Sequence, residues 1–299
     1  MRRFSMKYII GVDSGGTSTK AAAYDLNGRL LKETKTGFGN LLNNADEALL
    51  NIRQSITEIF EIHGESNCQR IVLGVAGIDS GGFRELLQND LDKFAPEVIL
   101  LNDAWLAHYA LLNGENGVLV ISGTGSVAIG KFEEIKERVG GYGNLLGDEG
   151  SGYDIARKMI KTTLNAYDEG REFSTLEEKV LSFGNFETVF DLVKFVYSSS
   201  KDKVAEFSML AVDEAEKGNN QAIYIFEEAG QDLAKQVILL LKKLGIDDQP
   251  KIAVTGSVLL QNDWVYAAFE KAIEAKYSNC QFVREDKSNT IGAYYYHIN

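Results

Sequence analysis

The stretch IIGVDSGGTSTK, residues 9–20, decides how this sequence folds. It joins a short apolar run, an aspartate, two glycines and several hydroxyl residues, and a second apolar run follows at 21–24. Short apolar runs bounded by glycine are typical of buried strands, so we predict a strand, a tight turn and a strand. The N–H groups around Gly15 and Gly16 can line an anion site. Asp13 beside them can hold hydrated Mg²⁺, which prefers carboxylate, phosphate and water, although a plain glycine hairpin is the alternative.

Composition indicates a globular protein with a sizeable core and few basic surfaces. The 299 residues are 44% hydrophobic and 25% charged, and 31 Lys and Arg stand against 43 Asp and Glu, a net charge of −12. Negative charge of this size disfavours nucleic acid and anionic membranes as partners. No apolar run reaches membrane length and the basic start is too short for a signal peptide, so we expect a cytoplasmic protein. Met6 is an alternative start.

Cysteine and histidine give no sign of a metal centre. Cys68 and Cys280 form no CxxC motif and are expected to be free thiols of a reducing compartment, with a single disulfide as the alternative. The three histidines are scattered and are expected to be structural or surface residues: His63, His108 and His297.

The first part of the chain reads as a mixed α/β domain. An Asn27-Gly28 turn predicts a hairpin into a third strand. Apolar periodicity then predicts helices and strands in alternation: helix 45–63, strand 70–77, helix 82–93, strand 98–103 and helix 104–112. Three strands in a hairpin set followed by alternating helices and strands indicate a mixed sheet flanked by helices.

The pattern restarts at VLVISGTGSVAIG, residues 118–130, which again reads as strand, Gly/Thr turn and strand. Two such units one domain apart indicate an internal duplication. A glycine-rich stretch at 140–152 then opens a helix at 151–166, and the chain is mostly helical up to 245. Residues 174–177 match a capping box, and apolar residues four apart from Ala229 to Leu241 predict one long helix that ends at Gly245. A strand at 251–255 leads into a glycine turn and a helix, and 289–297 is a last short helix.

Known nucleotide motifs narrow the phosphate chemistry. The chain has no G-x-x-x-x-G-K-[ST], so it is not a P-loop protein. Residues 123–128 match the dinucleotide fingerprint G-x-G-x-x-A, but that motif requires a following helix, and 127–132 reads as a strand. A Rossmann domain is therefore disfavoured.

Five motifs in order give a specific resemblance: DSGGT at 13–17, NDA at 102–104, SGTGS at 122–126, GYG at 141–143 with GDEGS at 147–151, and TGS at 255–257. Together they resemble the N-acetylglucosamine kinase family, within the sugar kinase/Hsp70/actin superfamily, and its relatives the BadF/BadG/BcrA/BcrD ATPases. The resemblance covers nearly the whole chain. It implies an α/β protein of two ribonuclease H-like (actin-like ATPase) domains with a cleft between them, each with a mixed five-stranded sheet flanked by helices. The expected domains are 1–115 with the C-terminal helix 287–299, and 116–286 with a helical insertion.

The resemblance also implies roles for individual residues, with ATP and Mg²⁺ as cofactors. Asp13 would serve Mg²⁺ and Asp103 would be the general base, since it ends a parallel-type strand, where α/β sites lie. The nucleotide would be bound by Gly15, Gly16, Thr17, Thr124, Gly125 and Gly256. The sugar would be held by Asn40, Asp103, Ser126, Gly141, Tyr142, Gly143 and Asp148. Tyr142 stands where the family often has tryptophan. Superfamily members are often dimers, so a homodimer is one expected form of the protein.

Purely structural roles are the alternatives to some of these assignments. Asp103 and Asp148 both stand near a helix start and could be N-caps, and Asn40 could cap local backbone.

The function that the resemblance implies is ATP-dependent phosphorylation of an amino sugar, most directly N-acetylglucosamine to its 6-phosphate, with glucosamine or N-acetylmuramic acid as alternatives. Other classes are an ATPase that activates an iron–sulfur dehydratase, which would need cysteine ligands, and a non-catalytic sugar sensor.

Overall fold

The computed structural model describes residues 6–299, so the choice between Met1 and Met6 as the start lies outside the described residues. The chain divides into two compact units, which we call unit 1 (residues 1–115 and 287–299) and unit 2 (residues 116–286). Each unit contains one five-stranded mixed sheet with helices packed on it. No helix in the described part of the chain is long and apolar enough to cross a bilayer.

Unit 1 alternates strands and helices after an opening hairpin set, as the sequence predicts. Its elements are β1 (Tyr8–Ser14), β2 (Thr19–Asp25), β3 (Leu30–Thr36), α1 (Ala45–His63), a short 3₁₀ turn (Glu65–Asn67), β4 (Cys68–Val75), α2 (Phe83–Leu91), β5 (Glu97–Asn102), α3 (Asp103–Leu111), a second 3₁₀ turn (Asn289–Ile291) and α12 (Gly292–Ile298).

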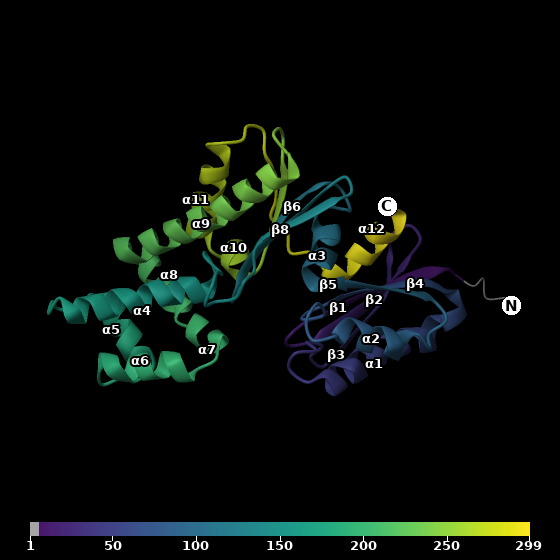
Figure 1. The fold of residues 1–299 in the computed structure, drawn as a ribbon, viewed down its shortest axis with the longest axis horizontal. Helices are drawn as coiled ribbons and strands as arrows, with labels where there is room; N and C mark the ends of the chain where they lie inside the picture. The colour runs from purple at the N-terminus through teal and green to yellow at the C-terminus, as the bar shows by residue number, and fades with distance from the viewer. Residues whose placement is uncertain (1–5) are drawn as a thin grey trace. The chain divides into compact units, whose positions relative to one another are not determined.

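The unit 1 sheet has helices on both faces because the side chains of β1 alternate between two cores. Figure 1 shows α1 and α2 on one face and α3 and α12 on the other. Tyr8, Ile10 and Val12 belong to the larger core, with residues of α1 and α2, whereas Ile9 packs on the opposite face beside Ile291. The end of the chain therefore completes the domain that its beginning starts.

Unit 2 begins with the second strand–turn–strand and ends with a short parallel strand. Its elements are β6 (Gly117–Ser122), β7 (Ser126–Phe132), β8 (Ile135–Gly140), α4 (Gly152–Asp168), α5 (Thr175–Phe183), α6 (Val189–Ser198), α7 (Lys201–Ala205), α8 (Ser208–Glu216), α9 (Asn220–Leu244), β9 (Lys251–Thr255), α10 (Ser257–Gln261), α11 (Asp263–Glu274) and β10 (Gln281–Val283). Since β7 follows the Gly/Thr turn, the fold is not a Rossmann domain, as expected.

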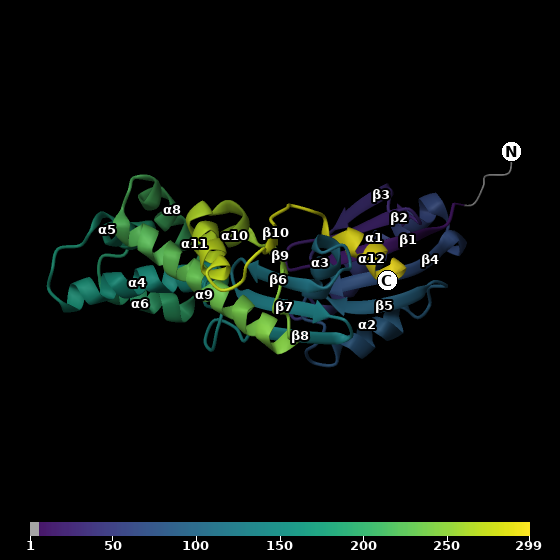
Figure 2. The same cartoon turned by 90° about the horizontal axis from the view of Figure 1, so that it is seen from above.

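The helical part of unit 2 is an insertion between β8 and β9. Figures 1 and 2 show α5 to α8 gathered beyond one end of the sheet, while α9 crosses β7 and β8 and packs along α11. The predicted capping box of α5 is present, with Ser174 and Glu177 each bonded to the backbone of the other. A long apolar stripe of α9 is buried in this core, and the helix ends at Gly245 in the left-handed conformation, as the sequence predicts.

The two sheets have the same topology, which supports the predicted duplication. Their orders are β3-β2-β1-β4-β5 and β10-β9-β6-β7-β8, so each strand of unit 1 has its equivalent five strands later. In both sheets the first strand pairs antiparallel with the second and parallel with the fourth. The two glycine–hydroxyl turns therefore occupy equivalent positions, between the first and second strands of each sheet.

Candidate active site

The register of the unit 1 sheet brings two carboxylates to one edge. Parallel pairing aligns Ser14 with Val75 and Val75 with Asn102, so β1, β4 and β5 end level with one another. Asp13 lies one residue before this row and Asp103 one residue after it. The carboxyl ends of parallel strands are where α/β proteins place their ligand sites.

Asp103 is the first residue of α3, but it is not the N-cap. Asn102 fills that role, since its Oδ1 accepts from the N–H of Ala104 at 3.0 Å. Helix α3 approaches β4 closely at Gly74, where a Cβ would lie 2.5 Å from the Cβ of Leu106 and 3.2 Å from the Cα of Asp103. Because Asn102 is the N-cap, the capping alternative for Asp103 is wrong, and the Oδ1 of Asp103 accepts from the N–H of Ala104 at 3.0 Å.

Burial perturbs the protonation of both carboxyl groups. Burial raises the pKa of Asp103 above its ordinary value, and the charge of Asp79 adds to this effect. Burial likewise raises the pKa of Asp13, a hydrogen bond from Asn289 opposes the rise, and the charge of Asp103 adds to it. The bond from Asn289 Nδ2 to Asp13 Oδ2 is 3.1 Å long. The C-terminal segment thus reaches into the site.

The first turn is fixed by backbone hydrogen bonds of Gly15, whereas Gly16 and Thr17 are open to solvent. The N–H of Gly15 donates to Ser18 O at 3.1 Å, and the carbonyl of Gly15 accepts from Gly39 N at 2.9 Å. Gly16 has open space where a Cβ would be, and Gly16 and Thr17 are exposed. Among the described residues the N–H groups of Gly16 and Thr17 donate to no backbone carbonyl. Two successive N–H groups without such partners are what an anion-binding turn requires.

Asn40 is tied to this turn through its neighbour. Gly39 packs so closely on Ser14 and Thr19 that a Cβ would overlap both hydroxyl groups. The Oδ1 of Asn40 accepts from Leu42 N at 3.0 Å, which is the local capping that the sequence left open. Gly39 is not among the site residues predicted from the sequence. Its signal was a second glycine in the loop directly before the predicted sugar-binding asparagine.

In unit 2 the second turn rests on the start of α4. The N–H groups of Gly152 and Tyr153 donate to the carbonyls of Gly123 and Thr124, at 2.8 and 3.3 Å. Within the turn, the N–H of Gly123 donates to Gly125 O at 3.0 Å. Gly123 has open space around a would-be Cβ, as Gly16 has in the first turn.

Asp148 lies against the second turn and does not cap α4. A Cβ on Gly125 would lie 2.8 Å from Asp148 Oδ2, and Asp148 Oδ1 accepts from Ser126 N at 3.3 Å. The N-cap of α4 is Ser151, so the capping alternative for Asp148 is wrong. Asp148 is 3% exposed and has a positive φ of 63°. This strained position holds its carboxylate beside the turn.

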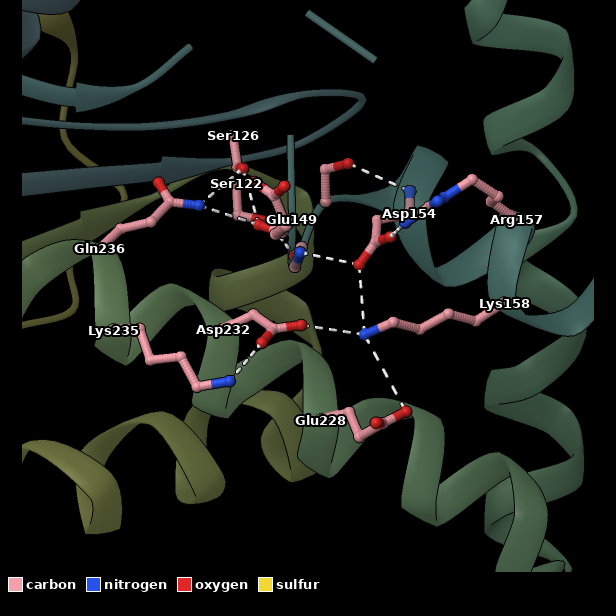
Figure 3. Close-up of polar contacts among 12 residues, drawn as sticks. Ser122, Ser126, Glu149, Asp154, Arg157, Lys158, Glu228, Asp232, Lys235 and Gln236 are labelled. Atoms are coloured by element: carbon pink, nitrogen blue, oxygen red, sulfur yellow. Dashed lines mark hydrogen bonds and ion pairs between the residues drawn. The ribbon is translucent and has the colours of Figure 1, made fainter. Parts of the chain in front are cut away.

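Figure 3 shows how the GDEGS loop that contains Asp148 is fixed. Ser126 Oγ donates to Glu149 O at 2.7 Å, and Gln236 Nε2 donates to the same carbonyl at 3.1 Å. Ser122 Oγ donates to Gly150 O at 2.9 Å, while Asp154 Oδ2 accepts from Gly150 N at 3.0 Å. The hydroxyl of Ser126 is thus buried in this network, where it positions the loop.

The remaining predicted residues of unit 2 lie around the same strand end. Gly256 follows β9 and approaches β6 so closely that a Cβ would overlap Ser122 O. The N–H of Gly141 donates to Ser126 O at 3.1 Å, and Gly141 and Gly143 have φ of 71° and 84°. Tyr142 between them is 62% exposed, so its ring is accessible.

A small cavity in unit 2 lies next to Gly256, because Ser257, the following residue, is part of its lining. It has a volume of about 170 Å³ and opens between α8 and α10. Apolar side chains line one part and polar ones another: Ile155, Met209, Val212, Phe226 and Val258, with Ser208, Ser257, Gln261 and Asn262. Apart from the TGS motif, which ends at Ser257, no sequence motif marks these residues, because they come from several separate helices.

The fold and these turns define a class: proteins built of two ribonuclease H-like, actin-like ATPase domains. The chain belongs to the BadF/BadG/BcrA/BcrD ATPase family, whose profile matches residues 10–294. A structure from Chromobacterium violaceum, described as a candidate N-acetylglucosamine kinase, has the same fold, with a TM-score of 0.75 at 21% identity over 97% of this chain and 98% of that one.

Two relatives that are named as sugar kinases match over nearly their whole length. An N-acetylmuramic acid/N-acetylglucosamine kinase of Clostridium acetobutylicum is 29% identical over 96% of this chain and 97% of its own. An N-acetyl-D-glucosamine kinase of Dictyostelium discoideum is 28% identical over 97% of each chain. The family expected from the five motifs is confirmed.

Proposed function

We propose that this protein transfers the γ-phosphoryl group of ATP to an amino sugar, most directly N-acetylglucosamine, to give the 6-phosphate. The observation that carries the proposal is the level row of strand ends in unit 1, which puts Asp13 and Asp103 at one edge beside an open glycine turn. Family membership and the names of the relatives support the same chemistry.

We assign Asp103 as the general base. Its carboxylate would take the proton of the sugar hydroxyl while the hydroxyl oxygen bonds to the γ-phosphorus and the bond from that phosphorus to the β–γ bridging oxygen breaks, releasing ADP. A carboxylate whose pKa is raised by burial is a better proton acceptor than an exposed one. The carboxylate of Asp103 accepts from the N–H of Ala104, and an ionised carboxylate has about four acceptor positions, so positions remain for a hydroxyl group.

The residues of unit 1 fit a bound Mg²⁺. Burial and the charge of Asp103 both raise the pKa of Asp13, and a hard divalent cation would offset this cost of ionisation. Among the described residues no group of three or more His, Cys, Asp and Glu side chains forms a metal cage, and Mg²⁺ is commonly held by one or two carboxylates together with substrate phosphates. Bound there, Mg²⁺ would neutralise the phosphate charge.

We assign the nucleotide to the two turns and the cavity. The N–H groups of Gly16 and Thr17, with Gly15 fixing the turn, would bind the β- and γ-phosphates, and Thr124 and Gly125 would supply further phosphate contacts. The cavity beside Gly256 would receive the adenosine, since it combines an apolar wall with amide and hydroxyl groups that can bond ring nitrogens.

We assign the sugar to Asn40, Asp103, Asp148 and the Gly141-Tyr142-Gly143 loop. Short turns with glycines on both sides of an aromatic residue let backbone N–H groups approach hydroxyl groups while the ring covers a sugar face. Ser126 would contribute to sugar binding by positioning the loop that contains Asp148, because its own hydroxyl donates to Glu149 O.

A coupled assay of ADP release tests the proposal. We expect turnover with N-acetylglucosamine that exceeds turnover with glucose or N-acetylmannosamine, with glucosamine and N-acetylmuramic acid as the two close competitors. ADP release that no sugar accelerates would contradict the proposal and favour a stand-alone ATPase. The thiols oppose the dehydratase-activator alternative: burial raises the pKa of Cys68 to about 12 and raises that of Cys280, which disfavours the thiolates that a cluster needs.

A further inference from the structure

Arg138 is unusual among the arginines of unit 2. Three of the four bond a carboxylate: Arg157 with Asp154, Arg171 with Glu177 and Arg284 with Asp263. Arg138 makes no ion pair among the described residues, and its guanidinium lies over the ring of Tyr142, 5.3 Å from the ring centre.

The position of Arg138 is fixed by its backbone and by the ring. It pairs with Ile129 across β7 and β8, and its carbonyl accepts from Lys243 Nζ at 3.2 Å. Lys243 itself is neutralised by Glu137 at 2.7 Å, so it does not compete for an anion. A guanidinium that lies over an aromatic ring can still donate hydrogen bonds from its N–H groups.

This guanidinium stands directly beside the loop that we assign to the sugar. Gly140, the last residue of β8, pairs with Val127. Gly140 and Gly141 both have positive φ, so the chain turns sharply between Arg138 and Tyr142. Arg138 and Tyr142 are both exposed, so neither is buried in the core of unit 2. The hydroxyl and acetamide groups of a neutral amino sugar do not require a full positive charge.

We infer that Arg138, held on the ring of Tyr142, selects amino sugars that carry a carboxylate substituent. A guanidinium recognises a carboxylate through two parallel N–H···O bonds, and such charge-assisted bonds are about twice as strong as neutral ones. Because the net charge of the protein repels anions, an acidic sugar needs a local cation of this kind. The inference rests on the proposed function and names a substrate class for it.

The test compares N-acetylmuramic acid, which carries an acidic ether, with neutral N-acetylglucosamine. In the Arg138→Gln variant we expect kcat/KM for N-acetylmuramic acid to fall about ten- to a hundredfold, while kcat/KM for N-acetylglucosamine stays within about twofold. Arg138→Lys keeps the positive charge but not the two parallel N–H donors of the guanidinium. Its kcat/KM for N-acetylmuramic acid should therefore lie between those of the wild-type protein and Arg138→Gln. Lys276→Gln, an equal charge change on an exposed side chain, is the control.

Ionic strength gives a second readout, since salt screens an exposed ion pair. The KM of the wild-type protein for N-acetylmuramic acid should rise with salt, whereas that for N-acetylglucosamine should not. An unchanged ratio of the two substrates in Arg138→Gln, or turnover of N-acetylglucosamine alone, overturns the inference and leaves the kinase proposal standing. If neither sugar is phosphorylated, the kinase proposal fails, and calorimetric binding of N-acetylmuramic acid to the wild-type protein and Arg138→Gln still decides the role of Arg138.

Discussion

Asp103 begins α3 directly after Asn102 has capped it, and this division of labour leaves the aspartate available for chemistry. An aspartate used as a cap has its oxygen committed to backbone N–H groups. Here Asn102 takes that role with an uncharged amide. The pair therefore fixes the helix start and presents a carboxylate at the same place.

Asp103→Asn tests the proposed base. We expect kcat to fall about 10²- to 10⁴-fold, the usual contribution of a general base, while the sugar still binds, because the amide keeps the size and an acceptor oxygen of the carboxylate. Coupled kinetics with a separate calorimetric measurement of sugar binding would show this. Turnover within a few-fold of the wild-type protein would move the role of base away from Asp103.

The same substitution should stabilise the free protein at neutral pH. Since burial raises the folded-state pKa of Asp103 above its unfolded value, the native state binds more protons between the two values, and stability falls as pH rises through that window. The variant lacks this penalty, so its Tm should exceed that of the wild-type protein at pH 7. The difference should shrink as the pH falls below the ordinary aspartate pKa.

Scanning calorimetry across pH measures this gain. Asp286→Asn, at an exposed aspartate, removes the same formal charge and should change Tm little. A lower Tm for Asp103→Asn at pH 7 would show that its carboxylate is stabilised by contacts that outweigh its burial.

At the scale of elements, the approach of β9 to β6 depends on Gly256. Gly256→Ala should cost about 1–3 kcal/mol of unfolding free energy, because φ is 92° and the new Cβ overlaps Ser122 O. Gly218→Ala is the matched control, since Gly218 has φ of 80° but open space around a Cβ. Urea unfolding of both variants measures the two losses of unfolding free energy, and their difference is the cost of the overlap with Ser122 O. Equal losses would refute the close approach of β9 to β6.

The join between α5 and α8 depends on an ionised Glu214. Hydrogen bonds from Lys179 and then Thr175, at 2.9 and 2.8 Å, lower the pKa of Glu214 to about 2. A carboxyl group with a depressed folded-state pKa stabilises the protein above its unfolded pKa of about 4.5, and that stability is lost as pH falls toward about 2.

Acid unfolding of Glu214→Gln measures this contribution. We expect the variant to be less stable than the wild-type protein at pH 7 and to lose less stability between about pH 4.5 and pH 2. Glu187→Gln, at an exposed glutamate, is the control. Parallel pH profiles for Glu214→Gln and the wild-type protein would contradict the role of this ion cluster.

The sequence predicted the elements well because their signals are local. The hairpin strands, the apolar stripe of α9 and the capping box at Ser174 each lie within a few residues of one another, and all are found. The equivalence of the two sheets was also visible, since both glycine turns follow a strand at the same place in the repeat.

What the sequence could not predict comes from contacts between distant segments. The bond from Gln236 to Glu149 joins residues 87 apart, and the bond from Asn289 to Asp13 joins residues 276 apart. The N-caps show the same limit at short range, because Asn102 and Ser151 were as suitable as Asp103 and Asp148, and only the backbone path selects between them. The roles of the individual site residues stay predictions.

At the scale of the molecule, unit 1 is built from both ends of the chain. Thr290 Oγ1 and Tyr24 OH bond at 2.8 Å, and Gly11 lacks the Cβ that would overlap Thr290 O. Removing residues 287–299 should therefore expose the Ile9 face of the sheet and destabilise unit 1 far more than unit 2. Hydrogen exchange would show this as lost protection in β1 and β4.

The control for this truncation keeps the segment and changes only an exposed position in it. Ile298 is 53% exposed, so Ile298→Ser should leave the protection of both units unchanged. Retained protection in β1 after the truncation would mean that unit 1 is complete without the last helix.

The closing of unit 1 by residues 287–299 also fixes an order of events during synthesis on the ribosome. Unit 2 ends at residue 286, so every strand and helix it needs has been translated while unit 1 still lacks its final helix. Domains usually fold in the order in which they are made. In this protein the domain that starts first must wait with part of an apolar sheet face uncovered, and nascent chains stalled before residue 287 should be the ones that chaperones bind.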